Sequence, residues 1–425
     1  MAEIAILGYG TVGSGVAEVL DKNRLSIDKK AAQPIRIKYI LDKRAFPGDP
    51  RARLLTREYT RILNDDDISV VVECMGGAEP AYTYLKQALL RGKSVVTSNK
   101  ELVAKHGAEL LSIAREKNIN FLFEASVGGG IPIIRPLNLS LTSDEITDLA
   151  GILNGTTNYI LTEMTRESLA TGAASFDEIL AAAQRQGYAE QNPADDIEGR
   201  DAARKLAILL SLATGRQIDF ESISTEGISR IECADILAAD KLGYCVKLLA
   251  AAKINHEKNE VAARVSPVLV PKAHPLAMVN DVFNAIFVKG EIIDELMFYG
   301  RGAGKLPTAG AVVADVVDAV KHLRYNIIHF WSNDPVNVAP ADAYPARRMF
   351  RARGRRELIA SRINTEAFVS GAAPGELAFI AGPLTDADAL ALGKELVKSD
   401  TGCSGPTGCS GPNCVNILSQ IRIFE

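Results

Sequence analysis

A run of carboxylates that ends on a lysine, GYAEQNPADDIEGRDAARK at residues 187–205, is the part of the sequence best suited to move a proton. A helix that starts near Gly199 would place Asp201 and Lys205 four residues apart, side by side on one face. When a carbonyl is reduced by hydride, its oxygen gains negative charge and must be protonated. A lysine held cationic beside a carboxylate can donate that proton and stabilise the charge.

The loop before this helix adds three further carboxylates, Glu190, Asp195 and Asp196. A loop carboxylate is what the α-ammonium group of an amino-acid substrate requires. The alternative is a solvated helix start that carries an exposed ion pair, and the spacing alone favours this alternative.

A ligand for hydride chemistry is predicted near the N-terminus, where GYGTVG fits the pattern G-x-G-x-x-G between an apolar strand and a helix. Gly8 permits a tight turn, Gly10 lets backbone N–H groups approach a pyrophosphate, and Gly13 allows close helix–strand packing. Thr11 and Val12 belong to the same turn. The strand and helix on either side favour dinucleotide binding over a glycine-rich turn without a ligand.

The residues after the second predicted strand, IRIKYIL, bear on the choice of dinucleotide. An acidic side chain there would accept the ribose hydroxyls of NAD, and a basic one would suit the 2′-phosphate of NADP. The strand is followed by Asp42, Lys43 and Arg44, farther from the glycines than is usual. NAD and NADP both stay open, as does an exposed charge cluster that binds neither.

Three regions must position these residues. Apolar strand-like runs alternate with helices over residues 1–126, which predicts an α/β fold with a Rossmann-type doubly wound parallel sheet. Residues 127–300 combine helical and strand-like patterns, which predicts an α+β substrate and dimerisation domain. A helix within 301–340 should pack back on the first domain. Residues 345–425 predict a small appended module with a strand, a helix and a strand.

The composition excludes several function classes. The chain has 425 residues, 47% hydrophobic and 24% charged, with a net charge of −4, as in a soluble globular protein with two to three domains. The net charge predicts no basic surface that would bind nucleic acid. No apolar run is long enough to predict a membrane span, and no targeting peptide is expected. The six cysteines fit a reducing cytoplasm better than a disulfide framework. Cys403, Cys409 and Cys414 lie in or beside the duplicated TGCSGPTGCSGP, where a mobile loop is favoured over a redox or metal site.

Six motifs together resemble the homoserine dehydrogenase family over at least residues 1–330: GYGTVG, VVTSNKELVA, FEASVGGGIPII, GILNGTTNYI, GYAEQNPADDIEGRDAARKLAIL and GRGAGKLPTAGAVVADVVD. The resemblance implies NAD(P)-dependent interconversion of L-aspartate 4-semialdehyde and L-homoserine in threonine, methionine and isoleucine biosynthesis. We further expect a homodimer or homotetramer whose interface uses the sheet of the substrate domain.

The resemblance also implies roles for single residues. Lys205, which closes the DAARK match, is the expected proton donor, and Lys100, from the SNK match, faces substrate and nicotinamide. The other matches are Asp201, Glu190, Asp196 and Thr156 at the substrate and Gly302 at the cofactor.

FEASVGGGIP resembles the monovalent-cation loop of the family. By analogy, Glu124, Val127, Gly129 and Ile131 would hold a structural sodium ion, mostly through backbone oxygens, which hard cations prefer. A tight hinge between domains is the alternative that the glycines allow.

The C-terminal region departs from the family pattern. Many relatives end in an ACT regulatory domain, and residues 345–425 are expected to be an ACT-like, degenerate version of it, since APGEL at 373–377 replaces the usual acidic-x-Pro-Gly-Val start. Two other functions compete: an aspartate-semialdehyde dehydrogenase that acylates a cysteine such as Cys233 or Cys245, and a non-catalytic nucleotide sensor that binds a partner through the basic segment 347–356.

Overall fold

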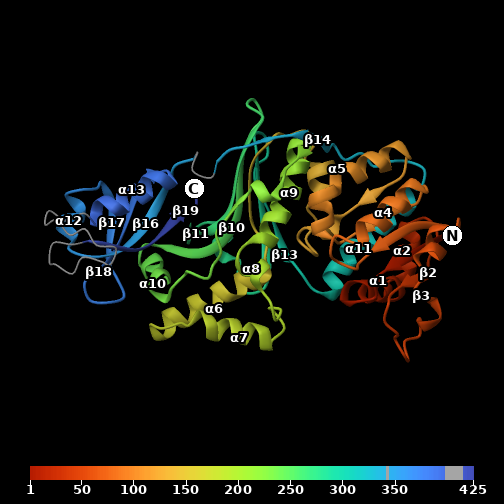
Figure 1. Ribbon diagram of the computed structural model, residues 1–425, viewed down its shortest axis with the longest axis horizontal. Helices are drawn as coiled ribbons and strands as arrows, with labels where there is room; N and C mark the ends of the chain where they lie inside the picture. Colours follow the sequence, from red (N-terminus) through yellow and green to blue (C-terminus); the bar gives the residue numbers. More distant parts are fainter. Residues whose placement is uncertain (341–343, 398–414) are drawn as a thin grey trace.

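The computed structural model describes residues 1–340, 344–397 and 415–425, so the predictions for Cys403, Cys409 and Cys414 lie outside the described residues. The described chain is elongated, with the N-terminal part at one end, a sheet flanked by helices in the middle and the C-terminal part at the other end (Figure 1). Within these ranges, no helix combines the length and the apolar character that crossing a membrane requires.

The N-terminal part is built on a parallel sheet of six strands in the order β3-β2-β1-β4-β5-β6. This is the doubly wound order of dinucleotide-binding folds, so the predicted fold class is confirmed. Strands β1, β4 and β5 are buried on both faces, which explains their nearly continuous apolar sequences, whereas β2 is half-buried and carries Arg36 and Lys38. Their bounds are β1 Ala2–Leu7, β2 Ile35–Leu41, β3 Leu55–Thr56, β4 Ile68–Glu73, β5 Ser94–Thr97 and β6 Phe121–Leu122.

Helices cover both faces of this sheet, and one of them comes from much later in the chain. Helix α11 (Lys305–Lys321) packs against α1 (Thr11–Lys22), and its Val312 and Val316 share a core with Ile4 and Ile6. Gly15 permits this contact because a Cβ atom there would lie 2.9 Å from the Lys305 carbonyl oxygen. The other helices of this part are α2 Arg24–Lys30, α3 Tyr59–Leu63, α4 Ala81–Leu90 and α5 Lys100–Glu116.

The middle part presents helices on one face of a mixed sheet. Strands β13-β12-β7-β10-β11 are neighbours in that order, and α6, α9 and α10 pack on them. The strands are β7 Ile146–Ile152, β10 Tyr244–Asn255, β11 Glu260–Pro271, β12 Phe283–Gly290 and β13 Asp294–Arg301. The helices are α6 Gly155–Thr171, α7 Phe176–Arg185, α8 Ala194–Ile197, α9 Arg200–Thr214 and α10 Cys233–Lys241.

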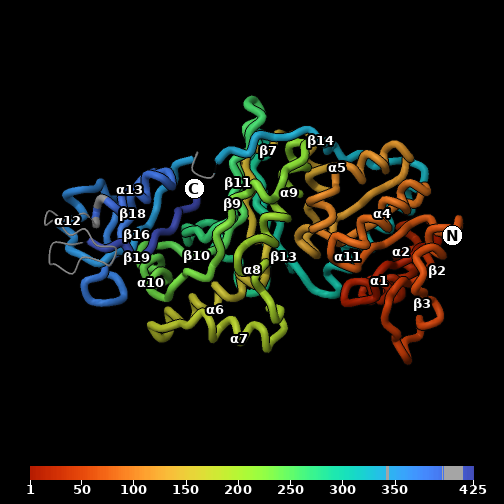
Figure 2. The backbone as a smooth tube through the Cα atoms, in the orientation of Figure 1, coloured from red at the N-terminus to blue at the C-terminus, as the bar shows by residue number. Residues whose placement is uncertain are grey.

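The same sheet continues into the C-terminal part. β11 pairs in parallel with β19, and the order then runs β19-β16-β18-β17. The chain reaches this part along one side of the molecule, past β14 (Ser332–Pro335) and β15 (Asn337–Val338) (Figure 2). Two short strands, β8 (Arg216–Gln217) and β9 (Ser224–Thr225), complete the strand pairing, β8 with β14 and β9 with β11.

The C-terminal part has two more strands than the sequence predicts. Its order is β16 (Ala346–Arg353), α12 (Arg356–Ala360), β17 (Thr365–Ser370), β18 (Glu376–Leu384), α13 (Asp386–Val397) and β19 (Asn416–Ile423). This is the βαββαβ order of ferredoxin-like folds rather than a single βαβ unit. β17 has no fully buried residue, so its sequence lacks a clear apolar alternation, and β16 is rich in arginine.

The arginines of β16 explain why a basic segment forms a strand. Arg351 is buried, its Nε lies 2.9 Å from Asp235 Oδ1 of α10, and its guanidinium also pairs with Glu232 and Glu376. Arg348, also buried, pairs with Asp386. Arg351 thus joins the C-terminal part to the middle part, whereas Arg353, Arg355 and Arg356 of the segment 347–356 are exposed.

Candidate active site

A cavity of about 330 Å³ lies where the N-terminal and middle parts meet. The N-terminal part contributes Gly76 and Gly77, after β4, and the segment 98–101, after β5. The middle part contributes Glu190 and residues around the start of α9, which lies against α5 (Figure 1). The cavity is therefore at the carboxyl ends of the parallel strands, where doubly wound sheets bind ligands.

The centre of the cavity wall is Asp201, a buried carboxylate with a lysine at each oxygen. Lys205 Nζ lies 2.7 Å from Asp201 Oδ2, and Lys100 Nζ lies 2.6 Å from Asp201 Oδ1. Asp201 and Lys205 are neighbours because α9 begins at Arg200, which confirms the predicted helix start and spacing. Lys100 comes from the first residue of α5, so it joins the pair only through the tertiary fold.

The ammonium group of Lys205 has two of its three hydrogens fixed. It donates to Asp201 Oδ2 and, at 2.7 Å, to the carbonyl oxygen of Leu153. No third acceptor for it is present in the described ranges. The side chain is only 12% exposed, and the two fixed hydrogens leave the remaining N–H a single direction.

Burial and charge set the pKa values of this group of residues. Burial lowers the pKa of Lys205 below its ordinary value, and the positive charge of Lys100 acts in the same direction. Burial also disfavours the charged form of Lys100, but Asp201 outweighs it and raises the pKa of Lys100. Burial would raise the pKa of Asp201, yet the two lysines hold it well below its usual range. Lys205 is thus the cation that gives up its proton more easily.

Asp196 lies next to Asp201, but its pKa is shifted in the opposite direction. Burial and the negative charge of Asp201 raise the pKa of Asp196. Asn154 bridges the two carboxylates, since its Nδ2 donates to Asp196 Oδ1 at 2.7 Å and to Asp201 Oδ2 at 2.9 Å.

A buried network shapes the N-terminal wall of the cavity. Glu73, at the end of β4, accepts hydrogen bonds from Met75 N, Gly76 N and Thr97 Oγ1. Asn99 caps α5 by accepting from Leu102 N at 3.1 Å and donates to the Gly77 carbonyl oxygen. These bonds fix both loops beside Lys100.

The glycine turn between β1 and α1 has the geometry that a dinucleotide requires. Gly8 has φ +90°, and a Cβ atom on Gly13 would lie 1.9 Å from the Gly8 carbonyl oxygen. A Cβ atom on Gly10 would approach only Arg44 Nη2, at 3.7 Å, so the outer side of the turn is open. Gly10 caps α1 without a side-chain hydrogen bond, and the first turn holds no acid, which leaves the helix N-terminus available to a phosphate.

The charged residues after β2 form a pair rather than three separate charges. Asp42 accepts from Tyr9 N at 2.8 Å and from Arg44 Nε and Nη2 at 3.0 and 2.8 Å. The Asp42 side chain is 8% exposed and that of Arg44 is 61% exposed. The Arg44 guanidinium holds the pKa of Asp42 well below its usual range.

The other predicted residues lie around this cavity or beyond it. Glu190 lies on the rim, exposed. Thr156 does not line the cavity and donates to the Tyr188 carbonyl oxygen at 2.7 Å. Gly302 packs on the glycine-rich bend, since a Cβ atom on Gly129 would lie 2.3 Å from its carbonyl oxygen. Glu124 is buried, and its carboxylate accepts hydrogen bonds from Ile133 N, Ile134 N and Arg135 N.

Sequence reasoning missed three polar residues of the site: Asn99, Asn154 and Arg204. Asn154 follows β7 and precedes α6, where asparagine is a common helix cap, so a capping pattern would have marked its position but not its two carboxylate partners. Arg204 lines the cavity and pairs with Asp195 at 2.8 Å.

The cysteines do not support the acylation chemistry that we considered as an alternative. Cys245 has its pKa raised by burial, and it lies on β10 rather than at the cavity. Cys233 starts α10, and its Sγ contacts the Gly172 carbonyl oxygen. An acylating thiol requires a lowered pKa or an adjacent base.

Comparison with known proteins agrees with this geometry. Residues 8–124 match the family model described as homoserine dehydrogenase, NAD binding domain, and residues 132–317 match the model described as homoserine dehydrogenase. The homoserine dehydrogenase of Bacillus subtilis (strain 168) is 43% identical over 327 residues, which are 76% of this chain and 74% of that protein. That of Synechocystis is 45% identical over 75% of this chain and 73% of that protein.

A solved structure extends the likeness to the whole chain. The crystal structure of a homoserine dehydrogenase from Thiobacillus denitrificans has a TM-score of 0.85 and 35% identity and covers 100% of this chain and 98% of that chain. The chain therefore belongs to the homoserine dehydrogenase family, NAD(P)-dependent oxidoreductases of amino-acid biosynthesis that act on the hydroxyl group of homoserine.

Proposed function

We propose that Lys205 is the proton donor when aspartate 4-semialdehyde is reduced and the proton acceptor when homoserine is oxidised. The observation that carries this proposal is the single unengaged N–H of Lys205 beside Asp201, which lines the cavity. In the reduction, hydride is added to the aldehyde carbon, the C=O π electrons move to oxygen, and Lys205 Nζ gives its proton to that oxygen. The lowered pKa of Lys205 favours this transfer because it makes the ammonium a stronger acid.

Lys100 has a different role in this proposal. Its raised pKa keeps it charged, and it lines the cavity from the start of α5. A fixed positive charge there stabilises the oxyanion as it forms. Asp201 holds both ammonium groups in place.

The substrate is gripped by the carboxylates of the middle part. Glu190 and Asp196 line the cavity and suit the α-ammonium group, and Thr156 braces the Tyr188 turn that precedes Glu190. The test of the whole assignment is a spectrophotometric assay of homoserine oxidation with NAD or NADP, with L-serine and L-threonine as controls. Equal rates on all three amino acids would contradict it.

The cofactor would be held by two sets of residues. The turn Gly8, Gly10, Thr11, Val12 and Gly13 suits its pyrophosphate, and Asp42, Lys43 and Arg44 suit its adenosine ribose. Lys100 and Gly302 would lie near the nicotinamide. The open side of Gly10 and the uncapped start of α1 support this fit. When bound, NAD(P) supplies or accepts the hydride.

We infer that the Asp42–Arg44 pair lets this chain use NADP as well as NAD. Arg44 neutralises the carboxylate that would repel a 2′-phosphate, and its exposed guanidinium can bind that phosphate. The Arg44→Ala substitution should lower kcat/KM for NADP by about 10- to 100-fold, the loss of a charge-assisted hydrogen bond, and change that for NAD far less. Steady-state kinetics with both cofactors measure this, with Arg61→Ala as a control. Equal losses for both cofactors would argue against the inference.

A structural sodium ion at the loop of Glu124, Val127, Gly129 and Ile131 also stays a proposal. The carboxylate of Glu124 already accepts from Ile133 N, Ile134 N and Arg135 N, so the donors that fit are backbone carbonyl oxygens. The bend at Gly128 and Gly129, both with positive φ, can turn successive carbonyl groups to one side. A higher melting temperature in sodium chloride than in choline chloride would support it, and equal melting temperatures would not.

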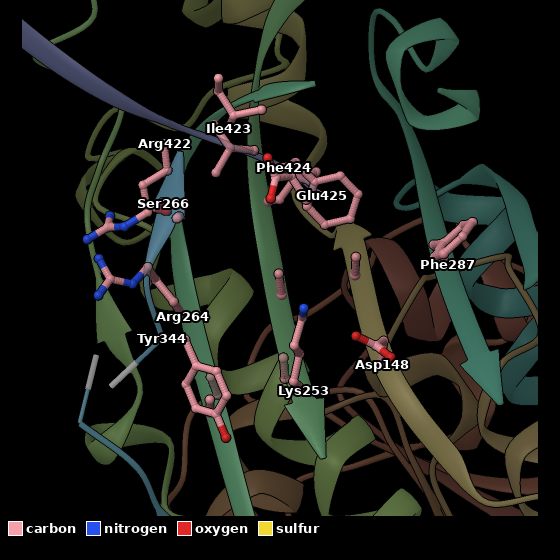
Figure 3. Close-up of a pocket in the computed structure, with 18 of the residues that line it drawn as sticks. Asp148, Lys253, Arg264, Ser266, Phe287, Tyr344, Arg422, Ile423, Phe424 and Glu425 are labelled. Carbon is pink, nitrogen blue, oxygen red and sulfur yellow. The ribbon is translucent and has the colours of Figure 1, made fainter. Parts of the chain in front are cut away.

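We infer that a second copy of the chain packs on the middle sheet at its exposed apolar strand β13. Alternate residues of the strands build an apolar cluster there, with Ala150, Leu249, Val268 and Phe287, on the face away from α6 and α9. Figure 3 shows this face, with Phe287 and Phe424 beside a hollow of about 540 Å³. The neighbouring strand β13 exposes Leu296, Met297 and Tyr299. Light scattering should give a dimer or tetramer mass, and Met297→Asp should lower it.

The division into a dinucleotide-binding domain (1–126, completed by the helix in 301–340), a substrate and dimerisation domain (127–300) and an ACT-like module (345–425) is likewise our proposal. The separate N-terminal sheet and the ferredoxin-like order of the C-terminal strands support it, and one continuous sheet joins the second domain to the third.

A further inference from the structure

Asn154 uses every hydrogen-bonding position of its side chain. Its Oδ1 accepts from Thr157 N at 2.9 Å and from Thr157 Oγ1 at 3.1 Å, and its Nδ2 donates to Asp196 and Asp201. The residue is only 6% exposed. A reversed amide would place its oxygen against two carboxylates and its NH₂ against a backbone N–H, so the network fixes the orientation.

This pattern requires an amide and excludes the other common helix caps. Aspartate and serine also cap helices well, and either could accept from Thr157 N. Aspartate would place a third carboxylate beside Asp196 and Asp201, and serine has one short donor that cannot span both. Capping therefore explains the oxygen of Asn154 but not its nitrogen.

The residue before Asn154 holds the lysine of the same centre. The Leu153 carbonyl oxygen accepts from Lys205 Nζ, and Lys205 in turn pairs with Asp201. One turn of backbone between β7 and α6 thus fixes Lys205 through a carbonyl group and its partner Asp201 through a side-chain amide. The direction of the remaining Lys205 N–H depends on both contacts.

We propose that Asn154 is a positioning residue, which sets the separation of Asp196 and Asp201 and thereby aims Lys205 at the substrate oxygen. This inference rests on the roles proposed above for Lys205 and Asp196. Asn154 need not touch the substrate, because it acts through the two carboxylates.

The electrostatics give this role a measurable consequence. The groups that face Asp196 are Asp201 and Lys205 from α9, Lys100 from α5 and Asn154 itself. The Asn154 hydrogen bond stabilises the charged form of Asp196, against burial and the charge of Asp201. Without that bond the pKa of Asp196 rises further, so a higher pH is needed to keep it ionised for an ammonium group.

The test compares Asn154→Ser and Asn154→Asp, which both keep a helix cap, with Ser175→Ala, which removes the cap of α7. In both Asn154 variants, kcat/KM for homoserine should fall by about 100-fold, as expected for a misplaced catalytic group. The acid limb of its pH profile should move to higher pH, and KM for the cofactor should stay unchanged. Ser175→Ala should keep wild-type kinetics.

Several results would overturn the proposal. It fails when a folded Asn154 variant keeps the wild-type kcat/KM and pH profile. It also fails when the loss of activity in the variants simply follows the drop in their melting temperature, because the role of Asn154 would then be structural. Asn154→Asp, which has nearly the same shape, decides the matter when the serine variant does not fold. Lys205→Ala, measured in parallel, separates failure of this proposal from failure of the proposed function. Full turnover in Lys205→Ala would contradict the proposed site as a whole.

Discussion

Replacing Lys205 by alanine should lower kcat for homoserine oxidation by about 10³-fold, within the range that general acid–base catalysis contributes. The variant loses the ammonium group that keeps one N–H free beside Asp201 and whose pKa is lowered by burial. Cofactor affinity, measured by fluorescence titration, should not change, because the glycine turn lies in the other part of the chain. Kinetics at saturating cofactor give kcat directly.

The chain offers a matched control for this experiment. Lys247 is another buried lysine, 3% exposed, with its pKa lowered by burial, but its ammonium group donates to three acceptors, Asn158 Oδ1, Val279 O and Asn280 Oδ1, and does not contact Asp201. Lys247→Met should keep turnover while it changes stability. If both variants lost activity equally, buried charge rather than proton transfer would explain the effect.

The pH dependence follows from the same lysine. Reduction requires the protonated amine, so its rate falls as the pH rises through the pKa of Lys205. Because burial lowers that pKa from 10.5, the fall begins at a lower pH than an exposed lysine would give. Lys205→Arg should lower the rate, because a guanidinium gives up its proton poorly, and its residual activity should lack this alkaline limb.

The second large effect is expected from Asp201→Asn. This change leaves two ammonium groups near each other without their shared carboxylate, at a site where the Asp201 side chain is 4% exposed. Breaking a buried ion pair in this way should destabilise the fold by about 3–5 kcal/mol. It should also lower kcat by about 100-fold or more, because both lysines lose their orientation.

The sign of the accompanying pH shift is fixed by the charges. Asp201 raises the pKa of Lys205, so its removal lowers that pKa further and moves the alkaline limb of the reduction to lower pH. Urea unfolding and pH–rate profiles measure the two effects. Asp240→Asn, which breaks an exposed pair with Lys272, is the control and should cost about 1 kcal/mol or less. An alkaline limb that stayed in place would mean that Asp201 does not set the pKa of Lys205.

The fold of the first part could be predicted because its signals are local. The apolar strands, the glycine turn and the helices follow each other at short range, and the observed strand order agrees with them. The C-terminal part was predicted less well. Its strand β17 is half exposed, and the arginines of β16 are neutralised only by residues of other elements. Neither fact is visible in the segment itself.

For the site, the sequence alone determined the relative positions of residues that lie within one helix or one turn. Four-residue spacing on α9 brings Lys205 to Asp201, and the glycines of the first turn leave room for a phosphate, since both effects need only the local backbone. Only the tertiary structure decided that Lys100 shares Asp201 and that Asn154 bridges two carboxylates. These contacts depend on how distant segments pack, and packing also sets the burial that separates the pKa values of the two lysines.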